Sequence, residues 1–317
     1  MELYIVVPCY NEEEVLPKTA AYLKEKRQFF NKNNSIRSRV IFVDDGSTDL
    51  TWNIIEKLHK ENSIFTGMKL SRNCGHQNAL LAGLMYAKDN CDVVISLDAD
   101  LQDDIDAIDD MLEKYKEGAD IVYGVRSKRD KDHIMKKYTA QAFYKLMSWL
   151  GAETVYNHAD YRLMSNKALE GLSEFHEVNL YLRGIIPLIG YKTAKVYYER
   201  KERAAGKSKY PIKKMVKFAV EGITSFSIKP MHIIIGVGAI MFGLSIFFLL
   251  WSVIGYIRGN TEPGWASLMV SLWAIGGMVL LCMGVIGEYI GKIYLETKAR
   301  PKYLVEIYLD KKDNTCS

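Results

Sequence analysis

The stretch Val93-Val94-Ile95-Ser96-Leu97-Asp98-Ala99-Asp100 joins an apolar run to two carboxylates that stand two positions apart. A short apolar run that stops at polar residues is typical of a strand buried on both faces of a sheet. Two carboxylates at the end of such a strand can face one hard cation, and oxygen ligands suit Mg²⁺ or Mn²⁺. Asp-x-Asp alone is common in solvated loops, but its position directly after a buried strand favours a metal site.

Four further apolar runs alternate with helical patterns along the N-terminal half of the chain. The strands are expected at 3–7, 40–43, 66–70, 93–97 and 120–123, and the helices at 11–27, 48–62, 76–89 and 104–117. This alternation predicts an α/β fold with a Rossmann-like, mostly parallel sheet and helices on both faces. Ligands bind beyond the carboxyl ends of the strands in such sheets. We expect Asn11 to cap the first helix and Ser47 or Thr48 to cap the second.

The charge distribution divides the chain into a body and an anchor. The 317 residues carry 42 basic and 38 acidic side chains, and the net charge of +4 is too mild to indicate a nucleic-acid partner. Between residues 231 and 290 the only charged residues are Arg258, Glu262 and Glu288. Crossing a bilayer takes about 20 apolar residues. We therefore expect a C-terminal hairpin of two transmembrane helices, at about 231–257 and 264–288.

Basic residues flank both ends of this hairpin. They are Lys207, Lys209, Lys213, Lys214, Lys217 and Lys229 before it, and Lys292, Lys298, Arg300 and Lys302 after it. The loop that connects the two predicted helices contains a single basic residue, Arg258. The positive-inside rule therefore predicts a multi-pass protein of the cytoplasmic (inner) membrane, with the body and both termini in the cytoplasm. Five scattered cysteines without a Cys-x-x-Cys pair also fit a reducing compartment and indicate neither zinc nor disulfides.

Two segments have the pattern of helices that lie in the membrane interface. Residues 211–229 repeat apolar side chains at helical spacing beside several lysines, which predicts an amphipathic interfacial helix. Residues 134–150 fit either such a helix or a helix packed on the core. The expected organisation is a catalytic domain at 1–210, the interfacial helix at 211–229, two spans within 230–290 and a cytoplasmic tail at 291–317.

Two features leave room for a homo-oligomer. Residues 301–310 alternate in hydrophobicity, which favours a strand whose edge is available to a partner subunit. Glycines in both predicted spans permit close helix packing, although glycine is frequent in membrane helices in general.

Three motifs together resemble glycosyltransferase family 2 with the GT-A fold. They are Val6-Val7-Pro8-Cys9-Tyr10-Asn11-Glu12-Glu13, Val43-Asp44-Asp45-Gly46-Ser47-Thr48-Asp49 and Leu97-Asp98-Ala99-Asp100-Leu101-Gln102-Asp103. Three later motifs are similar to those of the polyprenyl-phosphate glycosyltransferases, which include dolichyl-phosphate mannose synthase and the bacterial undecaprenyl-phosphate glucosyltransferases. These are Ser71-Arg72-Asn73-Cys74-Gly75-His76, Asp160-Tyr161-Arg162-Leu163 and Arg203-Ala204-Ala205-Gly206-Lys207-Ser208-Lys209-Tyr210. Asp104 stands where the family usually has proline, and Cys9 and His76 occupy variable positions.

The resemblance implies a nucleotide-sugar site, a metal site and a lipid-phosphate site. The nucleotide sugar would be bound by Pro8, Tyr10, Glu12, Asp44 and Asp98. A Mg²⁺ or Mn²⁺ cofactor would be held by Asp98 and Asp100, with Gln102 assisting. The lipid phosphate would lie at Arg126, Arg203, Ser208 and Lys209, and the catalytic residues would be Asp160 and Asp100.

Several of these residues have a second interpretation. Asp44 can also serve an Asx-type turn, and Lys209 can attract the membrane surface rather than the substrate. A phosphate monoester has a second pKa of about 6, so the acceptor needs no strong base near neutrality. Asp160 can therefore act as a base, orient the acceptor, bind sugar hydroxyls, stabilise positive charge, or pair with Arg162 or Arg126. The histidines, His76 among them, lack metal-ligand spacing, and we expect them to be structural.

The expected reaction is inverting transfer of a sugar, glucose from UDP-glucose, to undecaprenyl phosphate at the cytoplasmic membrane face. The product would supply cell-envelope glycosylation. Diacylglycerol or a glycan as acceptor, and UDP-N-acetylglucosamine, UDP-galactose or GDP-mannose as donor, stay open. A nucleotidyltransferase would want a basic loop near the N-terminus, where residues 8–14 are acidic instead. A non-enzymatic membrane scaffold would have no use for Asp98 and Asp100.

Overall fold

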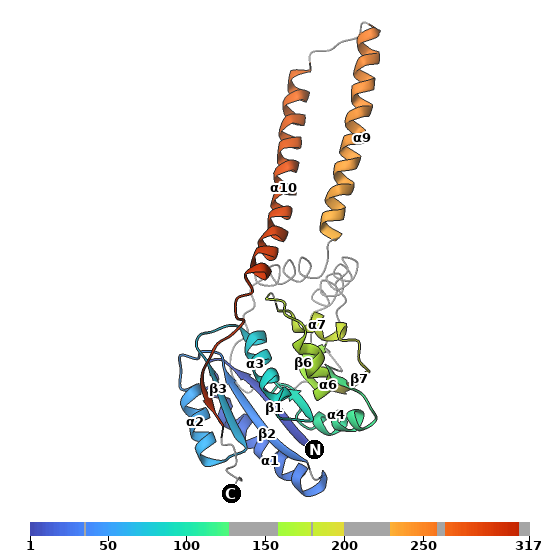
Figure 1. The fold of residues 1–317 in the computed structure, drawn as a ribbon. Coiled ribbons are helices and arrows are strands. Elements are labelled where there is room, and N and C mark those ends of the chain that lie inside the picture. The colour runs from blue at the N-terminus through green and yellow to red at the C-terminus, as the bar shows by residue number, and fades with distance from the viewer. Residues whose placement is uncertain (35, 127–157, 179, 200–228, 259–263, 311–317) are drawn as a thin grey trace. The chain divides into compact units, whose positions relative to one another are not determined.

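The computed structural model describes residues 1–34, 36–126, 158–178, 180–199, 229–258 and 264–310. Within them the body is built on one eight-stranded sheet (Figure 1). Across the sheet the strands lie in the order β7 (Thr193–Tyr198), β5 (Ile121–Arg126), β6 (His158–Ser165), β4 (Val93–Ser96), β1 (Glu2–Cys9), β2 (Arg37–Asp44), β3 (Phe65–Leu70) and β8 (Val305–Leu309). The helices of the body are α1 (Leu16–Asn34), α2 (Thr51–Glu61), α3 (His76–Lys88), α4 (Ala107–Lys116), α6 (Asn166–Ser173) and α7 (Leu182–Leu188).

The five strands expected from apolar runs all form, and the sheet contains three more. β4, β1, β2 and β3 pair in parallel, as the alternating pattern predicts. β6 then lies antiparallel between β4 and β5, and β7 adds in parallel to β5. The sheet is therefore parallel at its centre and mixed beyond β4.

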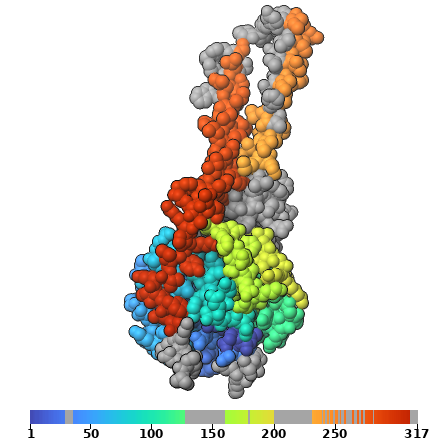
Figure 2. All heavy atoms as spheres, viewed as in Figure 1, coloured from blue at the N-terminus to red at the C-terminus, as the bar shows by residue number. Residues whose placement is uncertain are grey.

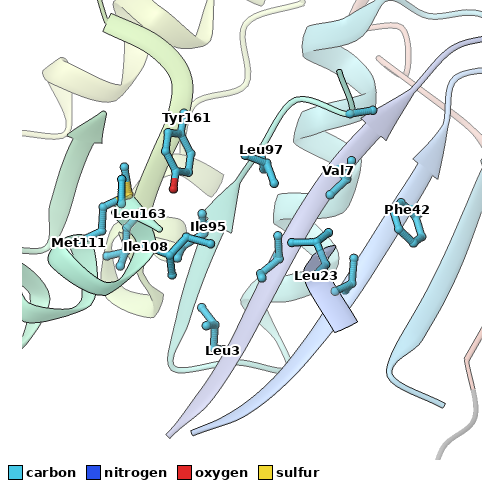
Figure 3. Packing of buried hydrophobic residues seen from close by; sticks show 14 of the residues in the cluster. Leu3, Val7, Leu23, Phe42, Ile95, Leu97, Ile108, Met111, Tyr161 and Leu163 are labelled. Atoms are coloured by element: carbon cyan, nitrogen blue, oxygen red, sulfur yellow. The ribbon is translucent and has the colours of Figure 1, made fainter. Parts of the chain in front are cut away.

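Helices cover both faces of the sheet because alternate residues of each strand point to opposite sides. Leu3, Ile5 and Val7 of β1 enter a core that also contains residues of α1, α2 and α4. Figure 3 shows part of this core, with Leu3 and Val7 of β1, Leu23 of α1 and Met111 of α4 labelled. On the other face α3 packs against β1, β2 and β4. The prediction of helices on both faces is confirmed.

The expected cap of the first helix is wrong. Asn11 has a φ of 53°, in the left-handed region, and α1 begins only at Leu16. The backbone N–H groups of Val15 and Leu16 donate to the carbonyl of Glu12 at 3.1 and 2.9 Å. The chain therefore makes a turn after β1 before the helix begins.

The expected cap of the second helix is also wrong. α2 begins at Thr51, and Leu50 at its N-cap provides no side-chain hydrogen bond. The backbone N–H of Thr51 instead donates to Asp49 Oδ1 at 3.0 Å. Ser47 and Thr48 lie too early in the chain and contact Asn11.

The C-terminal strand is present, and it pairs within the chain. β8 pairs antiparallel with β3 of the same chain, from Gly67–Leu309 to Leu70–Val305. Tyr86 of α3 donates to Asp310 at 2.8 Å, and its ring centroid lies 4.7 Å from that of Tyr308, with the two ring planes tilted by 52°. The strand thus covers an edge of the sheet that would otherwise be open for pairing.

Two long helices, α9 (Lys229–Ile257) and α10 (Trp265–Lys298), form the other part of the described chain. They carry many exposed apolar side chains, such as Trp251 at 69% and Leu280 at 71% exposure, and their surfaces are open on the face seen in Figure 2. Within the described residues, one stretch, Ala274–Lys298, is long and apolar enough to cross a membrane. The expected interfacial helices, 134–150 and 211–229, lie outside the described residues, apart from Lys229, which is the first residue of α9.

Replacing Gly83 by alanine is expected to destabilise the body. A Cβ atom at Gly83 would collide with Val6 and lie 2.9 Å from Val43 Cγ2, because α3 packs closely on β1 and β2. Overpacking of this kind costs about 1–3 kcal/mol. That exceeds the helix-propensity gain of alanine over glycine, which is about 1 kcal/mol. Urea unfolding of the purified protein measures the loss.

Val6→Ala provides the matched control. Added to Val6→Ala, the Gly83→Ala change should cost less than it does in the wild type, since the closer of the two colliding methyl groups is gone while that of Val43 stays. Equal costs in the two backgrounds would contradict a close contact at this position.

Candidate active site

The ends of β1 and β2 are tied together by hydrogen bonds between their loops. The backbone N–H of Asn11 donates to Ser47 Oγ at 3.0 Å, and that of Thr48 donates to Asn11 Oδ1 at 2.9 Å. Glu12 donates its backbone N–H to Thr51 Oγ1 at 2.9 Å. The sheet register places Pro8 beside Val43 and Cys9 beside Asp44. The structure therefore gathers the predicted nucleotide-sugar residues Pro8, Tyr10, Glu12 and Asp44 at one edge of the sheet.

Asp44 is fully buried, and its two carboxylate oxygens differ in their hydrogen bonding. Its Oδ1 accepts from the backbone N–H of Ser47 at 3.2 Å. Its Oδ2 has no hydrogen-bond partner among the described residues. Burial raises the pKa of the Asp44 carboxyl above its ordinary value. The side chain of Tyr10, at the end of β1, is 46% exposed. Both the turn interpretation and the ligand interpretation of Asp44 therefore fit its geometry.

Asp45 holds the loop that leads into α3. Its two carboxylate oxygens accept from the backbone N–H groups of Cys74 and Gly75 at 2.6 and 2.9 Å. Gly46, with a φ of 67°, lies so close to this loop that a Cβ atom would come within 2.6 Å of the Arg72 carbonyl carbon. These contacts fix the first residue of α3, His76, relative to the sheet.

Asp98, His76 and Asp160 converge from three different elements. His76 Nε2 lies 3.4 Å from Asp98 Oδ1 and 3.8 Å from Asp160 Oδ2. Burial raises the pKa of the Asp98 carboxyl to about 6; His76 opposes this rise, while Asp103 and Asp160 add to it. The sequence predicted a structural histidine here, and the structure places its side chain, 45% exposed, between two predicted site residues.

Asp100 and Gln102 belong to the tight turn that follows Asp98. Leu101 has a φ of 55°, and the backbone N–H of Gln102 donates to Asp100 Oδ1 at 3.2 Å. Gln102 is buried, at 7% exposure. Among the described residues there is no group of three or more His, Cys, Asp or Glu side chains arranged to hold a metal ion. A cation bound at Asp98 and Asp100 would therefore need further ligands from a substrate or from water.

Asp103 links the turn after β4 to the ends of β5 and β7. Tyr198 donates its hydroxyl to Asp103 Oδ1 at 2.5 Å, and Arg126 Nη2 lies 3.4 Å from the same oxygen. Asp103 has only 2% exposure. Arg126, predicted as a lipid-phosphate residue, thus has an internal carboxylate partner. The other residues predicted for that site, Arg203, Ser208 and Lys209, lie outside the described residues.

Asp160, near the start of β6, accepts hydrogen bonds from two arginines. Arg162 Nη2 donates to Oδ1 at 2.6 Å. Arg183 of α7 donates from Nε to Oδ1 at 3.1 Å and from Nη2 to Oδ2 at 3.0 Å. Burial would raise the pKa of the Asp160 carboxyl, but the charges of Arg162 and Arg183 outweigh it and hold the pKa below its ordinary value. The predicted pairing with Arg162 is confirmed, whereas the alternative pairing with Arg126 is wrong because Arg126 contacts Asp103.

Arg183 was not predicted from the sequence as part of the site. It lies 23 residues beyond Asp160 and belongs to no recognised motif. One local signal existed, since Arg183 is the sole charged residue in the otherwise apolar stretch 180–189.

Removing the hydroxyl of Tyr198 is expected to weaken the link through Asp103. Hydrogen bonds to charged groups contribute about 1.5–3 kcal/mol, so Tyr198→Phe should lower the free energy of unfolding by that amount. Urea titration at neutral pH checks the value. Tyr197→Phe, on the same strand with 66% exposure, is the control and should change stability by less than about 0.5 kcal/mol.

Asp160→Asn is expected to destabilise the protein and flatten its acid dependence. The change leaves Arg162, with 0% exposure, without its counter-charge, and breaking a buried pair in this way costs about 3–5 kcal/mol. The pKa of Asp160 is lowered in the fold by Arg162 and Arg183, so its contribution is complete above the unfolded-state value of about 4. That contribution is lost as the pH falls below it.

The measurement for Asp160→Asn is urea unfolding at pH 7 and at pH 3.5. Wild type should lose stability between the two, and the variant should lose less. Glu117→Gln, which removes the exposed pair with Lys114, is the control and should matter by less than about 1 kcal/mol. An Asp160→Asn protein as stable as wild type at pH 7 would refute the buried pair.

A family model and several known proteins are similar to this chain over much of its length. The model of the family "Glycosyl transferase family 2" matches residues 4–173. The "Uncharacterized glycosyltransferase YkoT" of Bacillus subtilis (strain 168) is 51% identical over 97% of this chain and 92% of its own length. The bactoprenol glucosyl transferase of Shigella phage SfV is 39% identical over 96% of this chain and 98% of its own. The prophage bactoprenol glucosyl transferase homolog of Escherichia coli (strain K12) is 38% identical over 96% and 99%.

Among solved structures, the mannosyltransferase PcManGT from Pyrobaculum calidifontis, in complex with GDP-Man and Mn²⁺, is similar at 17% identity with a TM-score of 0.45. The match covers 92% of this chain and 84% of that one. The family match together with the α/β sheet described above makes the body a GT-A-like fold. The chain is a glycosyltransferase and belongs to glycosyl transferase family 2.

Proposed function

We propose that this chain transfers glucose from UDP-glucose to a polyprenyl phosphate, with release of UDP. The observation that carries the proposal is its likeness to two proteins named bactoprenol glucosyl transferase, at 38–39% identity over nearly the whole length of both. Bactoprenol is a polyprenol, so its phosphate would be the acceptor. The cluster of Asp98, His76 and Asp160 at the carboxyl edge of the sheet is where such a transfer would take place.

The donor nucleotide fits the ends of β1 and β2. Asp44 Oδ2, which has no partner among the described residues, could accept from a base N–H or a ribose hydroxyl. Tyr10, which directly follows β1, is 46% exposed and could contact the same nucleotide. Pro8 and Glu12 line the same edge. These residues would orient the nucleotide so that its diphosphate extends toward β4.

The residues after β4 fit a hard divalent cation, either Mg²⁺ or Mn²⁺. Their donor set is oxygen from Asp98 and Asp100, with Gln102 beside them, and the pKa of Asp98 is raised to about 6 by burial and by its acidic neighbours. Mg²⁺ is commonly bound through one or two carboxylates, with substrate phosphates and water completing its shell. When bound, the cation would neutralise the diphosphate as it leaves.

The protein side chains would then bind and orient rather than accept a proton. The acceptor phosphate, with a second pKa of about 6, carries its attacking oxygen already ionised near neutrality. The carboxylate of Asp160 is held ionised by two arginines. A single displacement at the anomeric carbon would invert its configuration. Arg203, Ser208 and Lys209 remain proposed contacts of the lipid phosphate.

The anchor is proposed to be a hairpin of two membrane spans formed by α9 and α10. Ala274–Lys298 is long and apolar enough to cross a membrane, and α9 is 29 residues long with no Asp, Glu or Arg. The basic flanks favour a cytoplasmic location for both termini and for the catalytic domain at 1–210. An interfacial helix at 211–229 and a tail at 291–317 complete the proposed organisation. An anchored enzyme could meet a charged phosphate on an apolar tail at headgroup depth.

Transfer of radiolabelled sugar to undecaprenyl phosphate in detergent tests the proposal. A panel of UDP-glucose, UDP-N-acetylglucosamine, UDP-galactose and GDP-mannose is run with Mg²⁺ or Mn²⁺ and with EDTA. We expect metal-dependent label in the lipid product with UDP-glucose. Asp98→Ala should lower kcat/KM by about 100-fold or more, because a cation at a leaving group contributes several kcal/mol.

Asp110→Asn is the matched control, since it removes an exposed carboxylate of α4 and should leave transfer unchanged. Label with a different donor would replace glucose and leave the reaction class intact. Failure of every donor, by a protein that still binds UDP, would overturn the acceptor assignment.

A further inference from the structure

The order of strands across the sheet sorts the site into a donor side and an opposite side. β4, which leads to Asp98, lies between β1 and β6. Tyr10 and Asp44 follow β1 and β2 on one side of it. Asp160 lies on β6 on the other side, where the Ser96–Arg162 register places it beyond the end of β4. A donor that reaches from Asp44 to Asp98 would therefore present its sugar toward Asp160.

The charge on that opposite side is positive. Asp160 is the shared partner of Arg162 and Arg183, so one carboxylate faces two guanidinium groups. Arg162 has 0% exposure and cannot reach a ligand. Arg183 has 43% side-chain exposure. The surplus positive charge is therefore accessible on Arg183.

The geometry of Arg183 is suited to hold an oxyanion. Asp160 accepts hydrogen bonds from its Nε–H and from one Nη2–H, at 3.1 and 3.0 Å. These two bonds fix the plane of the guanidinium group. A guanidinium has five N–H donors, so three are left by the contacts that the described residues make. Arginine binds phosphate through such planar, paired donors.

Short contacts connect Arg183 to Asp98, the proposed cation ligand. Asp160 Oδ2, which accepts from Arg183, lies 3.8 Å from His76 Nε2, and that atom lies 3.4 Å from Asp98 Oδ1. A phosphate on Arg183 would thus lie beside the sugar of a donor whose diphosphate is at Asp98.

We propose that Arg183 binds the phosphate of the lipid acceptor and that Asp160 is the positioning residue that aims it. The inference rests on the proposed function. In the step it supports, an acceptor phosphate oxygen forms a bond to the anomeric carbon while the bond from that carbon to the diphosphate breaks. The electron pair leaves with the diphosphate, and no proton has to be transferred. Asp160, with hydrogen-bond donors on both oxygens, serves this step by orientation.

Steady-state kinetics of Arg183→Gln and Arg183→Lys test the proposal, with both substrates varied. Hydrogen bonds to charged groups are worth about 10-fold to 100-fold in binding, so Arg183→Gln should raise KM for undecaprenyl phosphate by about that factor. KM for UDP-glucose and the affinity for UDP with Mn²⁺ should stay within about twofold. Arg183→Lys should lie between wild type and Arg183→Gln, since lysine keeps the charge but loses the paired geometry.

Asp160→Asn supplies the second arm. It should raise KM for the lipid, and the double variant with Arg183→Gln should be less impaired than the two separate effects multiplied, because both act through one contact. Lys167→Gln, which removes an exposed charge paired with Asp120 at 3.9 Å, is the matched control and should change neither KM.

The outcomes separate this inference from the function on which it rests. If wild type transfers no sugar to lipid phosphate, the proposed function fails. If wild type transfers and Arg183→Gln keeps its lipid KM, the role of Arg183 is refuted. A weaker affinity for UDP with an unchanged lipid KM would assign Arg183 to the donor diphosphate instead. UDP binding by each variant shows that its site is folded, and Arg183→Lys provides the same test should Arg183→Gln fail to fold.

Discussion

Several carboxylates lie together at the carboxyl edge of one sheet. The surrounding residues have to balance their negative charge, and this constraint shapes the rest of the site. Asp98, Asp103 and Asp160 lie close enough to influence one another, and the pKa of Asp98 rises to about 6. Each has its own compensation: a histidine beside Asp98, a tyrosine and an arginine at Asp103, and two arginines at Asp160. Asp98 is the least compensated of the three. A divalent cation is the group that would complete the balance there.

The central strands could be predicted because they are buried on both faces and read as continuous apolar runs. β6 escaped prediction for the opposite reason. Its buried positions include Tyr161 and Arg162, so the strand shows neither an apolar run nor a regular alternation. The burial of Arg162 is possible only because Asp160 on the same strand neutralises it. β8 was recognised as a strand, but alternation reveals which residues face a neighbour and not which strand that neighbour is.

Arg126 and Asp160 were expected from the family resemblance alone. Other predicted site residues stand where a predicted strand ends, because the pattern that marks the strand also fixes where its end lies. Asp44 and Asp98 belong to this class. His76 and Arg183 enter from helices, and their distances to the site depend on how α3 and α7 pack. His76 further depends on Asp45, which holds the preceding backbone from 29 and 30 residues away. Long-range contacts of this kind leave no periodic signal in the sequence.

The strand order assigns each part of the proposed reaction to a different set of strands. The proposed nucleotide contacts would come from β1 and β2, the proposed cation ligands follow β4, and the proposed acceptor contact depends on β6 and α7. Substitutions at the end of one strand can therefore change which donor or acceptor is bound without disrupting the proposed cation site. Asp160 is the exception, since it neutralises a buried arginine and orients an exposed one at once. A substitution there couples folding to substrate binding, and activity alone would misreport its role. Stability and both KM values have to be read together at that position.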